Sequence, residues 1–267
     1  MTTSSPPETW ASGDAYEPYV GRWSRLVARD FLPWLALEEG AQWLDVGCGT
    51  GALSAAILER CAPRSVVGVD PSEGYLAHAR EQVRDARMEF RTGDAQALPV
   101  ADGLFDAAVS GLVLNFVPDA ERAVAEQRRA VRSRGTVAAY VWDYAGKIEL
   151  MRYFWDAATA LDPAARELDE GVRFPIANPA SLTALFQRAG LLAVDVRAID
   201  VPTVFRDFDD YWTPFLGGQA PAPGYCMSLS EQRREALRDR IRTALPIRPD
   251  GTIHLIARAW AVKGHVP

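Results

Sequence analysis

Cysteine and histidine are scarce in this sequence, and neither residue type is clustered. The 267 residues include 3 cysteines and 3 histidines, at Cys48, Cys61, Cys226, His78, His254 and His265. An odd cysteine count without a CxxC pair argues against a disulfide framework and against a zinc site, and no HExxH segment occurs. The sequence therefore predicts no metal centre, and a reducing, cytoplasmic location is the expectation.

A surplus of positive charge is also missing. The formal net charge is -6 at pH 7, whereas affinity for nucleic acid or for anionic membranes usually requires a basic face. No apolar run approaches the roughly 20 residues that span a bilayer, and the first residues lack the basic flank and apolar core of a signal peptide. We expect neither a nucleic-acid partner nor a membrane partner.

Strands and helices alternate along the first half of the chain. Short apolar runs predict strands, and segments with helical periodicity separate them. The predicted strands are 42–46, 65–69, 88–91, 105–110 and 136–142, and the predicted helices among them are 50–60, 73–84 and 120–132. This alternation predicts βαβ units, and hence a parallel α/β sheet with helices on both faces.

The pattern changes after residue 142. Helices are predicted at 147–161, 179–189 and 230–245, and strands at 192–204 and 252–262. A segment rich in glycine and proline, 217–224, is expected to form a loop.

The strongest local signal is a glycine-rich turn directly after the first predicted strand. Residues 44–51 read LDVGCGTG, so Gly47, Gly49 and Gly51 stand where a strand passes into a helix. Glycine lets the backbone bend tightly and approach a ligand, and the amides of a helix N-terminus face that ligand. The spacing is GxGxG and not the GxGxxG that fits a dinucleotide, which argues against a nicotinamide-dependent oxidoreductase.

Acidic residues follow the next two predicted strands. Asp70 ends the second strand, where a carboxylate can accept hydrogen bonds from two ribose hydroxyls. Asp94 follows the third strand, where a carboxylate can accept from the amine of a base. The carboxyl ends of parallel strands share one edge of the sheet, where open α/β folds bind ligands. The glycine turn and the two acids therefore predict a ligand site at this edge.

The stretch from Asp45 to Phe116 resembles the cofactor half of the class I S-adenosylmethionine-dependent methyltransferases. The resemblance implies a Rossmann-like, doubly wound sheet of seven mostly parallel strands with the last strand antiparallel, and S-adenosylmethionine as cofactor. It places the glycine turn at the methionine moiety, Asp70 at the ribose and Asp94 at the adenine amine. The implied cofactor residues are Asp45, Gly47, Gly49, Gly51, Asp70, Pro71, Asp94, Ala95, Ser110 and Leu112. Each acid also has a structural interpretation, as a brace of the turn (Asp45), a helix N-terminal residue (Asp70) or a turn former (Asp94).

Segment 16–24, YEPYVGRWS, resembles the N-terminal lid of small-molecule methyltransferases of this class. The resemblance implies a flexible arm at 1–14 and one methyltransferase domain over 15–264, with a lid at 15–40 and a helical cap at 206–248. Tyr16, Tyr19 and Arg22 then bind the cofactor, Arg22 at its carboxylate, although a solvated Arg22 is an alternative. One departure is the sequence at 133–135, Ser-Arg-Gly, where many members have Pro-Gly-Gly; Gly135 is interpreted as the glycine that ends the preceding helix.

Aromatic residues gather outside the cofactor half, and the resemblance places them over the substrate. They predict a dry pocket for a small apolar or aromatic acceptor, with core packing as the alternative for each. The predicted substrate contacts are Asn115, Trp142, Tyr211, Trp212 and Phe215. Asp143 and Tyr144 are the candidate catalytic residues, Asp143 as the general base of an O-methylating enzyme, although an acid after a strand is also typical of a turn.

Two further alternatives concern the function. The arginines at 233–242 resemble a nucleic-acid footprint, and thus an RNA methyltransferase, but interleaved acids and an apolar stripe favour a salt-bridged helix packed on one face. A protein that binds the same cofactor without transferring a methyl group, as a binding module or as a catalyst of another reaction, is compatible with the same residues, because a fold does not determine chemistry. The sequence favours methyl transfer to a small molecule.

Overall fold

The computed structural model describes residues 21–218 and 220–267, which divide into two compact units. The sheet unit comprises Trp23–Asp143, Phe174–Val201 and Arg258–Pro267. The helical unit comprises Tyr144–Arg173 and Pro202–Ala257, together with Gly21 and Arg22. Each unit is therefore assembled from segments that are far apart in the sequence.

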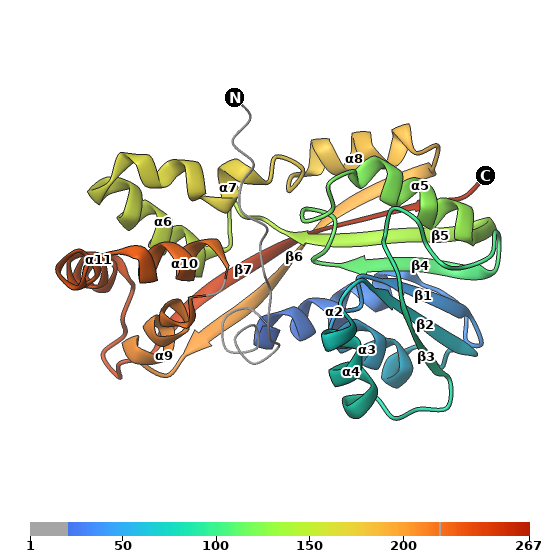
Figure 1. Cartoon of the computed structure of the whole chain (residues 1–267), viewed down its shortest axis with the longest axis horizontal. Helices are drawn as coiled ribbons and strands as arrows, with labels where there is room; N and C mark the ends of the chain where they lie inside the picture. The colour runs from blue at the N-terminus through green and yellow to red at the C-terminus, as the bar shows by residue number, and fades with distance from the viewer. Residues whose placement is uncertain (1–20, 219) are drawn as a thin grey trace. The chain divides into compact units, whose positions relative to one another are not determined.

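The sheet has seven strands in the order β3-β2-β1-β4-β5-β7-β6 (Figure 1). Neighbouring strands from β3 to β5 pair in parallel, and β7 is antiparallel to β5. The strands are β1 (Gln42–Val46), β2 (Ser65–Asp70), β3 (Met88–Thr92), β4 (Phe105–Gly111), β5 (Val131–Trp142), β6 (Leu192–Phe205) and β7 (Ile253–His265). The predicted Rossmann-like sheet, mostly parallel with an antiparallel last strand, is confirmed.

Helices cover both faces of this sheet, as predicted. Figure 1 shows α5 (Ala120–Ala130) and α8 (Pro179–Arg188) on one face and α2 (Arg22–Leu35), α3 (Ala52–Arg60) and α4 (Glu73–Gln82) on the other. The chain runs from β1 outward through β2 to β3 and then returns to build β4 and β5 on the other side of β1. Right-handed crossovers in opposite directions place the connecting helices on opposite faces, and the ligand edge lies where the direction reverses.

The described part of the predicted lid is a packed helix of the sheet unit. Phe31 of α2 is fully buried, and its ring centroid lies 4.8 Å from that of Tyr140 in β5. Lys263 of β7 donates a hydrogen bond of 2.8 Å to the carbonyl oxygen of Trp34. An apolar stripe that faces a sheet produces this packing, and the role of segment 15–40 as a lid stays a prediction. Residues 15–20 of that lid, and the predicted arm at 1–14, lie outside the described residues.

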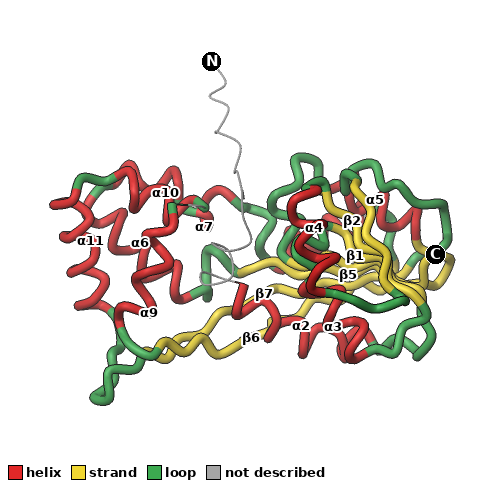
Figure 2. The backbone as a smooth tube through the Cα atoms, turned by 60° about the horizontal axis from the view of Figure 1, so that its bottom comes forward, coloured by secondary structure: helices red, strands yellow, loops and turns green. Residues whose placement is uncertain are grey.

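The helical unit has an aromatic core. Phe154 stacks on Phe215 with ring centroids 4.6 Å apart and an interplanar angle of 11°, and Tyr211 lies 5.5 Å from Phe215. Figure 2 distinguishes its helices in red. They are α6 (Glu149–Leu161), η2 (Pro163–Leu168), α7 (Glu170–Arg173), α9 (Phe208–Trp212), η3 (Thr213–Gly217), α10 (Pro221–Ser228) and α11 (Glu231–Ala244). This unit contains the predicted cap, 206–248, together with the segment 144–173.

The arginine-rich helix α11 has a packed face. Leu237 and Ile241 are buried, and the guanidinium carbons of Arg238 and Arg242 lie 5.4 and 5.0 Å from the ring centroid of Phe208. These contacts agree with a helix whose arginines serve packing and surface charge. In the part of the chain that the structure describes, no helix is both long enough and apolar enough to traverse a bilayer.

Candidate functional site

The glycine turn after β1 adopts a backbone conformation that favours glycine. Gly47, Gly49 and Gly51 have φ values of 71°, 53° and 86°, in the left-handed region that costs other residues free energy. A Cβ on Gly47 would lie 2.5 Å from a side-chain carbon of Val113, whereas a Cβ on Gly49 would meet nothing within 4 Å. The turn is therefore tightly packed at Gly47 and open at Gly49, which leaves room for a ligand beside the backbone.

Asp70 connects this turn to the start of α4. Its Oδ2 accepts a hydrogen bond of 2.9 Å from the Gly49 amide, and its Oδ1 accepts one of 2.9 Å from the Ser72 amide. Burial raises the pKa of Asp70, and the two amides oppose the shift. Each carboxylate oxygen has two lone pairs, so both oxygens retain an acceptor position for a ligand.

Asp45 is buried beneath the turn with one oxygen unused. Its Oδ2 accepts a hydrogen bond of 2.6 Å from the Ser54 hydroxyl, while Oδ1 has no hydrogen-bond partner among the described residues. Burial raises the pKa of Asp45 to about 7, the Ser54 hydrogen bond lowers it, and the charge of Asp70 raises it further. On the neighbouring strand β4, the fully buried hydroxyl of Ser110 also lacks a partner within the described residues. Buried polar atoms without partners are uncommon in folded proteins, and these two fit a polar ligand group.

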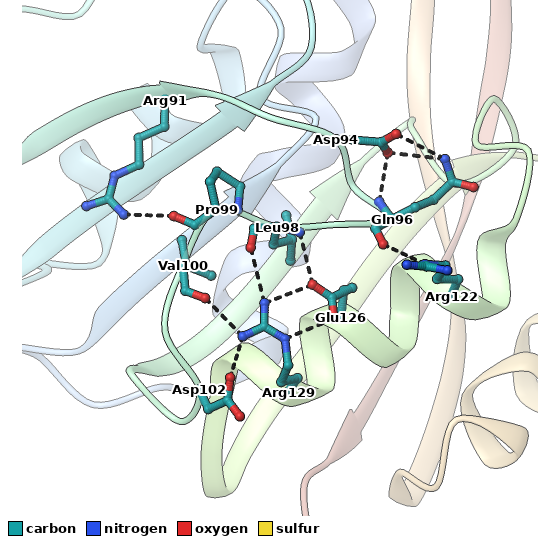
Figure 3. Close-up of polar contacts among 10 residues, drawn as sticks. All are labelled: Arg91, Asp94, Gln96, Leu98, Pro99, Val100, Asp102, Arg122, Glu126 and Arg129. Atoms are coloured by element: carbon teal, nitrogen blue, oxygen red, sulfur yellow. Dashed lines mark hydrogen bonds and ion pairs between the residues drawn. The ribbon is translucent and has the colours of Figure 1, made fainter.

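Asp94 begins a loop that runs from the end of β3 to β4. It accepts hydrogen bonds from the Gln96 amide at 2.8 Å and from the Gln96 side chain at 3.2 Å (Figure 3). These contacts hold the pKa of Asp94 below its ordinary value. Asp94 is thus a turn former, as its structural interpretation proposed, and its carboxylate is also exposed at the ligand edge of β3 and available to a base amine.

Arg129 of α5 holds this loop from below. Its guanidinium donates to the carbonyl oxygens of Leu98 (3.2 Å) and Val100 (2.9 Å) and pairs with Glu126 (2.8 Å) and Asp102 (2.5 Å). Glu126 in turn accepts a hydrogen bond of 2.9 Å from the Leu98 amide. Figure 3 shows the guanidinium at the centre of these contacts. The sequence alone does not reveal this anchor, because Glu126 and Arg129 look like an ordinary i,i+3 surface pair and their backbone partners carry no sequence signal.

The end of β4 completes the edge. Leu112 has a φ of 63°, uncommon for a residue other than glycine, and its amide donates a hydrogen bond of 2.8 Å to the Tyr140 carbonyl. A Cβ on Gly111 would lie 2.5 Å from the Tyr140 hydroxyl. The sharp bend after Ser110 is therefore set by close packing against β5. Asn115 follows it and is half-buried.

The candidate catalytic residues fall on both sides of the unit boundary. Asp143 follows β5 in the sheet unit, and its amide donates a hydrogen bond of 2.9 Å to the Arg258 carbonyl. The Arg258 guanidinium is bound by Asp200 at 2.6 Å and also feels the negative charge of Asp143, which contributes to its raised pKa. Tyr144 is buried in the helical unit. Their catalytic role stays a prediction.

Three of the predicted substrate contacts lie in the aromatic core of the helical unit. Tyr211 is buried, and its hydroxyl donates a hydrogen bond of 2.7 Å to the Leu150 carbonyl. Phe215 is fully buried, and Trp212 stacks on Phe208 with an interplanar angle of 9°. This geometry favours the alternative of core packing for all three. Trp142, in β5, is buried with its indole nitrogen unpartnered among the described atoms.

The predicted cofactor residues are also divided between the two units, and two of them lie outside the described residues. The structure brings together Asp45, Gly47, Gly49, Gly51, Asp70, Pro71, Asp94, Ala95, Ser110 and Leu112 in the sheet unit. Arg22 belongs to the helical unit, where it pairs with Asp210 at 3.1 Å and lies 4.9 Å from the ring centroid of Phe205. Tyr16 and Tyr19 lie outside the described residues. Binding of the cofactor carboxylate by Arg22 therefore stays a prediction.

Comparison with known proteins assigns the family. A model of the methyltransferase domain family matches residues 44–139, which span the glycine turn, both acids and the Arg129 anchor. The malonyl-[acyl-carrier protein] O-methyltransferase of Pectobacterium atrosepticum is 32% identical over 176 residues, covering 66% of this chain and 67% of the relative. The chain belongs to the class I S-adenosylmethionine-dependent methyltransferases. The predicted family is thereby confirmed, and S-adenosylmethionine is the cofactor of this methyltransferase family.

The chain spans about half the length of another curated relative that it matches. The enzyme of the same name from Geobacter sulfurreducens is 34% identical over 126 residues, and the match covers 46% of this methyltransferase and 47% of the relative. Among solved structures, phosphoethanolamine N-methyltransferase 2 of Haemonchus contortus has a TM-score of 0.58 at 16% identity, covering 95% of this chain and 57% of that one. The [4+2]-cyclase SpnF has a TM-score of 0.52 at 18% identity, covering 91% and 80%. At such identities the structures show a shared fold.

Proposed function

We propose that this methyltransferase transfers the methyl group of S-adenosylmethionine to a small, largely apolar or aromatic molecule. The observation that carries the proposal is the open glycine turn, with the carboxylate of Asp70 bonded to the Gly49 amide at its rim. When bound, the cofactor supplies a methyl group on a sulfonium that is already an activated leaving group. The chain then needs to hold it, to orient an acceptor and to exclude water.

Asp70 and the glycine turn hold the ribose side of the cofactor. Both oxygens of Asp70 already accept one backbone amide each, so the carboxylate is fixed in position before its remaining lone pairs receive the ribose hydroxyls. Pro71 follows Asp70 and limits the backbone at this point. The open space beside Gly49 lets the ligand approach the backbone closely.

Asp45 and Ser110 bind the amino-acid end of the cofactor. Each contributes a buried oxygen without a partner among the described residues, and β1 and β4 are adjacent, with Asp45 in register with Val109. An ammonium group is the natural partner for such oxygens, because a buried carboxylate is stabilised by a cation. Binding of the cation thus favours the ionised form of Asp45, whose pKa burial raises to about 7.

Asp94 and the Ala95 amide recognise the adenine. The amine of the base donates to the carboxylate, and the position of that carboxylate depends on the loop that Arg129 anchors to α5. Arg129 is therefore a positioning residue for the base.

The acceptor is a small molecule. The related proteins include a trans-aconitate 2-methyltransferase, a malonyl-[acyl-carrier protein] O-methyltransferase and a demethylmenaquinone methyltransferase. In this chain Trp142 ends β5 as a buried aromatic residue, and Asp143 follows it as the residue best placed by position to accept a proton. Tyr211, Trp212 and Phe215 are assigned to the core of the helical unit, because their rings and the Tyr211 hydroxyl are already used there.

The test uses methyl-labelled cofactor with a metabolite extract and with a panel of small phenols and carboxylic acids. Label transfer with formation of S-adenosylhomocysteine supports the proposal, and Asp70→Asn should reduce it by at least about tenfold, since one charge-assisted hydrogen bond contributes 1.5–3 kcal/mol. Asp195→Asn, an exposed position in β6, is the matched control. Tight cofactor binding without transfer of the label would show that the chain catalyses another reaction or only binds the cofactor. Absence of cofactor binding would overturn the whole assignment.

A further inference from the structure

The helical unit contains a pocket that the proposed methyl transfer does not use. It has a volume of about 300 Å³ and is formed entirely within this unit by α6, η2, α10 and α11. The lining residues are Ala158, Leu161, Asp162, Pro163, Tyr225, Leu229, Arg233, Ala236 and Leu237. A volume of 300 Å³ corresponds to roughly ten water molecules, at the lower end of the range of small-molecule sites.

Most of the pocket wall is apolar. Leu161, the last residue of α6, is 47% exposed, although large apolar side chains are usually covered. Tyr225 forms a rigid part of the wall: it is only 9% exposed, and its ring centroid lies 5.8 Å from that of Trp155 and 6.3 Å from that of Phe154. The pocket therefore combines an uncovered aliphatic side chain with an aromatic ring fixed by the core.

Three polar side chains line this pocket, those of Asp162, Tyr225 and Arg233. Burial raises the pKa of Tyr225, the carboxylate of Asp162 adds to this rise, and the guanidinium of Arg233 opposes it, so both charges act on the phenol hydroxyl. Asp162 is already engaged at the start of η2, where it accepts a hydrogen bond of 3.0 Å from the Ala164 amide. Arg233 is not engaged in this way, because within the described ranges its side chain forms no ion pair or hydrogen bond. The residues three and four positions after it, Ala236 and Leu237, offer no acid.

Neighbouring arginines of α11 are used in a different way. Arg234 donates to the carbonyl oxygens of Cys226 (3.1 Å) and Leu229 (3.0 Å), and Arg238 pairs with Asp209 at 3.4 Å. Arg233 is the arginine of this helix that lines the pocket. A guanidinium whose donors are unused beside an apolar wall is suited to a carboxylate, which it binds with two parallel hydrogen bonds.

We propose that this pocket binds a small monocarboxylic acid with an aromatic or branched apolar body. The carboxylate pairs with Arg233, the apolar body lies between Leu161 and the ring of Tyr225, and the Tyr225 hydroxyl supplies a second donor. An anion is favoured over a cation because the guanidinium of Arg233 has no partner within the described ranges, whereas Asp162 already caps η2 through the Ala164 amide. The proposal is independent of methyl transfer, and its test needs no cofactor.

The probe is phenylacetate, whose ten non-hydrogen atoms suit the volume, with 2-phenylethanol as its uncharged counterpart. Titration calorimetry on the full chain should give saturable phenylacetate binding with a Kd roughly millimolar or tighter, and binding of 2-phenylethanol at least about tenfold weaker. Arg233→Gln should weaken phenylacetate binding by about tenfold or more. Arg240→Gln, an exposed arginine of the same helix outside the pocket, should leave it unchanged.

A second variant tests the location of the ligand. Ala236 lines the pocket and is exposed, so Ala236→Phe fills the space from the surface without disturbing buried packing and should abolish binding. Circular dichroism and the unfolding midpoint verify that each variant is folded. No saturable binding to the unaltered chain, equal affinity for the alcohol, or equal loss in the Arg233 and Arg240 variants would each overturn the proposal.

Discussion

Replacing Arg129 by methionine should weaken the recognition of adenine more than it weakens the fold. The guanidinium donates to two carbonyl oxygens of the loop that begins at Asp94, those of Leu98 and Val100. Methionine keeps much of the aliphatic stem but has no donor. The loop then loses these two bonds, whereas the Leu98 amide still donates to Glu126 and Arg122 of α5 still donates to the Gln96 carbonyl at 2.8 Å. The backbone bonds from the Gly103 and Leu104 amides to the end of α5 also remain.

The size of the effect follows from the partners of Arg129. Hydrogen bonds from a charged donor contribute roughly 1.5–3 kcal/mol each, but the side chain is 29% exposed, so the low end applies. The pair with Asp102 adds little, because the Asp102 side chain is 80% exposed and such pairs are worth about 0–1 kcal/mol. We therefore expect a loss of about 3 kcal/mol of loop anchoring from the two bonds. If the loop is then in its binding position in roughly one molecule in ten, the apparent affinity for the cofactor product falls about tenfold.

The assay is calorimetric titration with S-adenosylhomocysteine and with its inosine counterpart, which lacks the amine of the base. In the unaltered chain the adenosine compound should bind more tightly, because the proposed site pairs its amine with Asp94. In Arg129→Met this preference should shrink, since the carboxylate is no longer held in place. Arg128→Met, at an exposed position of the same helix, is the control. An unchanged preference in the folded Arg129 variant would refute a positioning role, whatever the change in overall affinity.

Three further predictions concern stability and the core. Burial raises the pKa of Asp45 to about 7 from an ordinary value of 3.8, so the native state binds more protons between these pH values and this residue lowers stability as pH rises from about 4 to 7. Asp45→Asn should remove that slope, and urea unfolding at pH 5 and pH 7 with equal gains for the variant would contradict the argument. Gly47→Ala should lower stability by roughly 2–4 kcal/mol through backbone strain and a clash, against about 1–2 kcal/mol for Gly40→Ala, where a Cβ meets nothing; equal losses in thermal unfolding would exclude the clash. Tyr211→Phe should cost about 1 kcal/mol by losing the bond to the Leu150 carbonyl and leave turnover unchanged, whereas a large fall in turnover would restore Tyr211 as a substrate contact.

The strand positions could be predicted because their sequence signal is local. Buried parallel strands read as continuous apolar runs, and β1 begins and ends at the predicted residues, Gln42 and Val46. The glycine turn could also be predicted, since a left-handed backbone conformation at three nearby positions favours glycine.

Helix boundaries and the roles of single glycines were harder to predict where long-range packing determines them. Segment 217–224 was predicted as a loop, yet α10 begins at Pro221, because proline is favoured in the first turn of a helix. Gly135 was predicted to end the helix before β5, and this was wrong. The helix ends at Ala130, the positive φ of 65° belongs to Arg134, and a Cβ on Gly135 would lie 2.7 Å from the Asp106 carbonyl oxygen of β4. That glycine is required by the approach of two strands.

The anchoring of the Asp94 loop and the membership of the helical unit were beyond sequence reasoning. Arg129 binds backbone carbonyls about thirty positions earlier in the chain, and any residue type supplies a carbonyl. The helical unit joins segments 144–173 and 202–257 through aromatic contacts such as Phe154 on Phe215, and neither segment identifies the other by its own periodicity.

The paired use of Asp70 by the amides of Gly49 and Ser72 has a kinetic consequence. Because the carboxylate already ties the bend after β1 to the first turn of α4, the binding surface is preorganised and little chain entropy is lost on capture. Association should then be limited by encounter and not by folding of the turn, and affinity changes at this position should appear mainly in the dissociation rate.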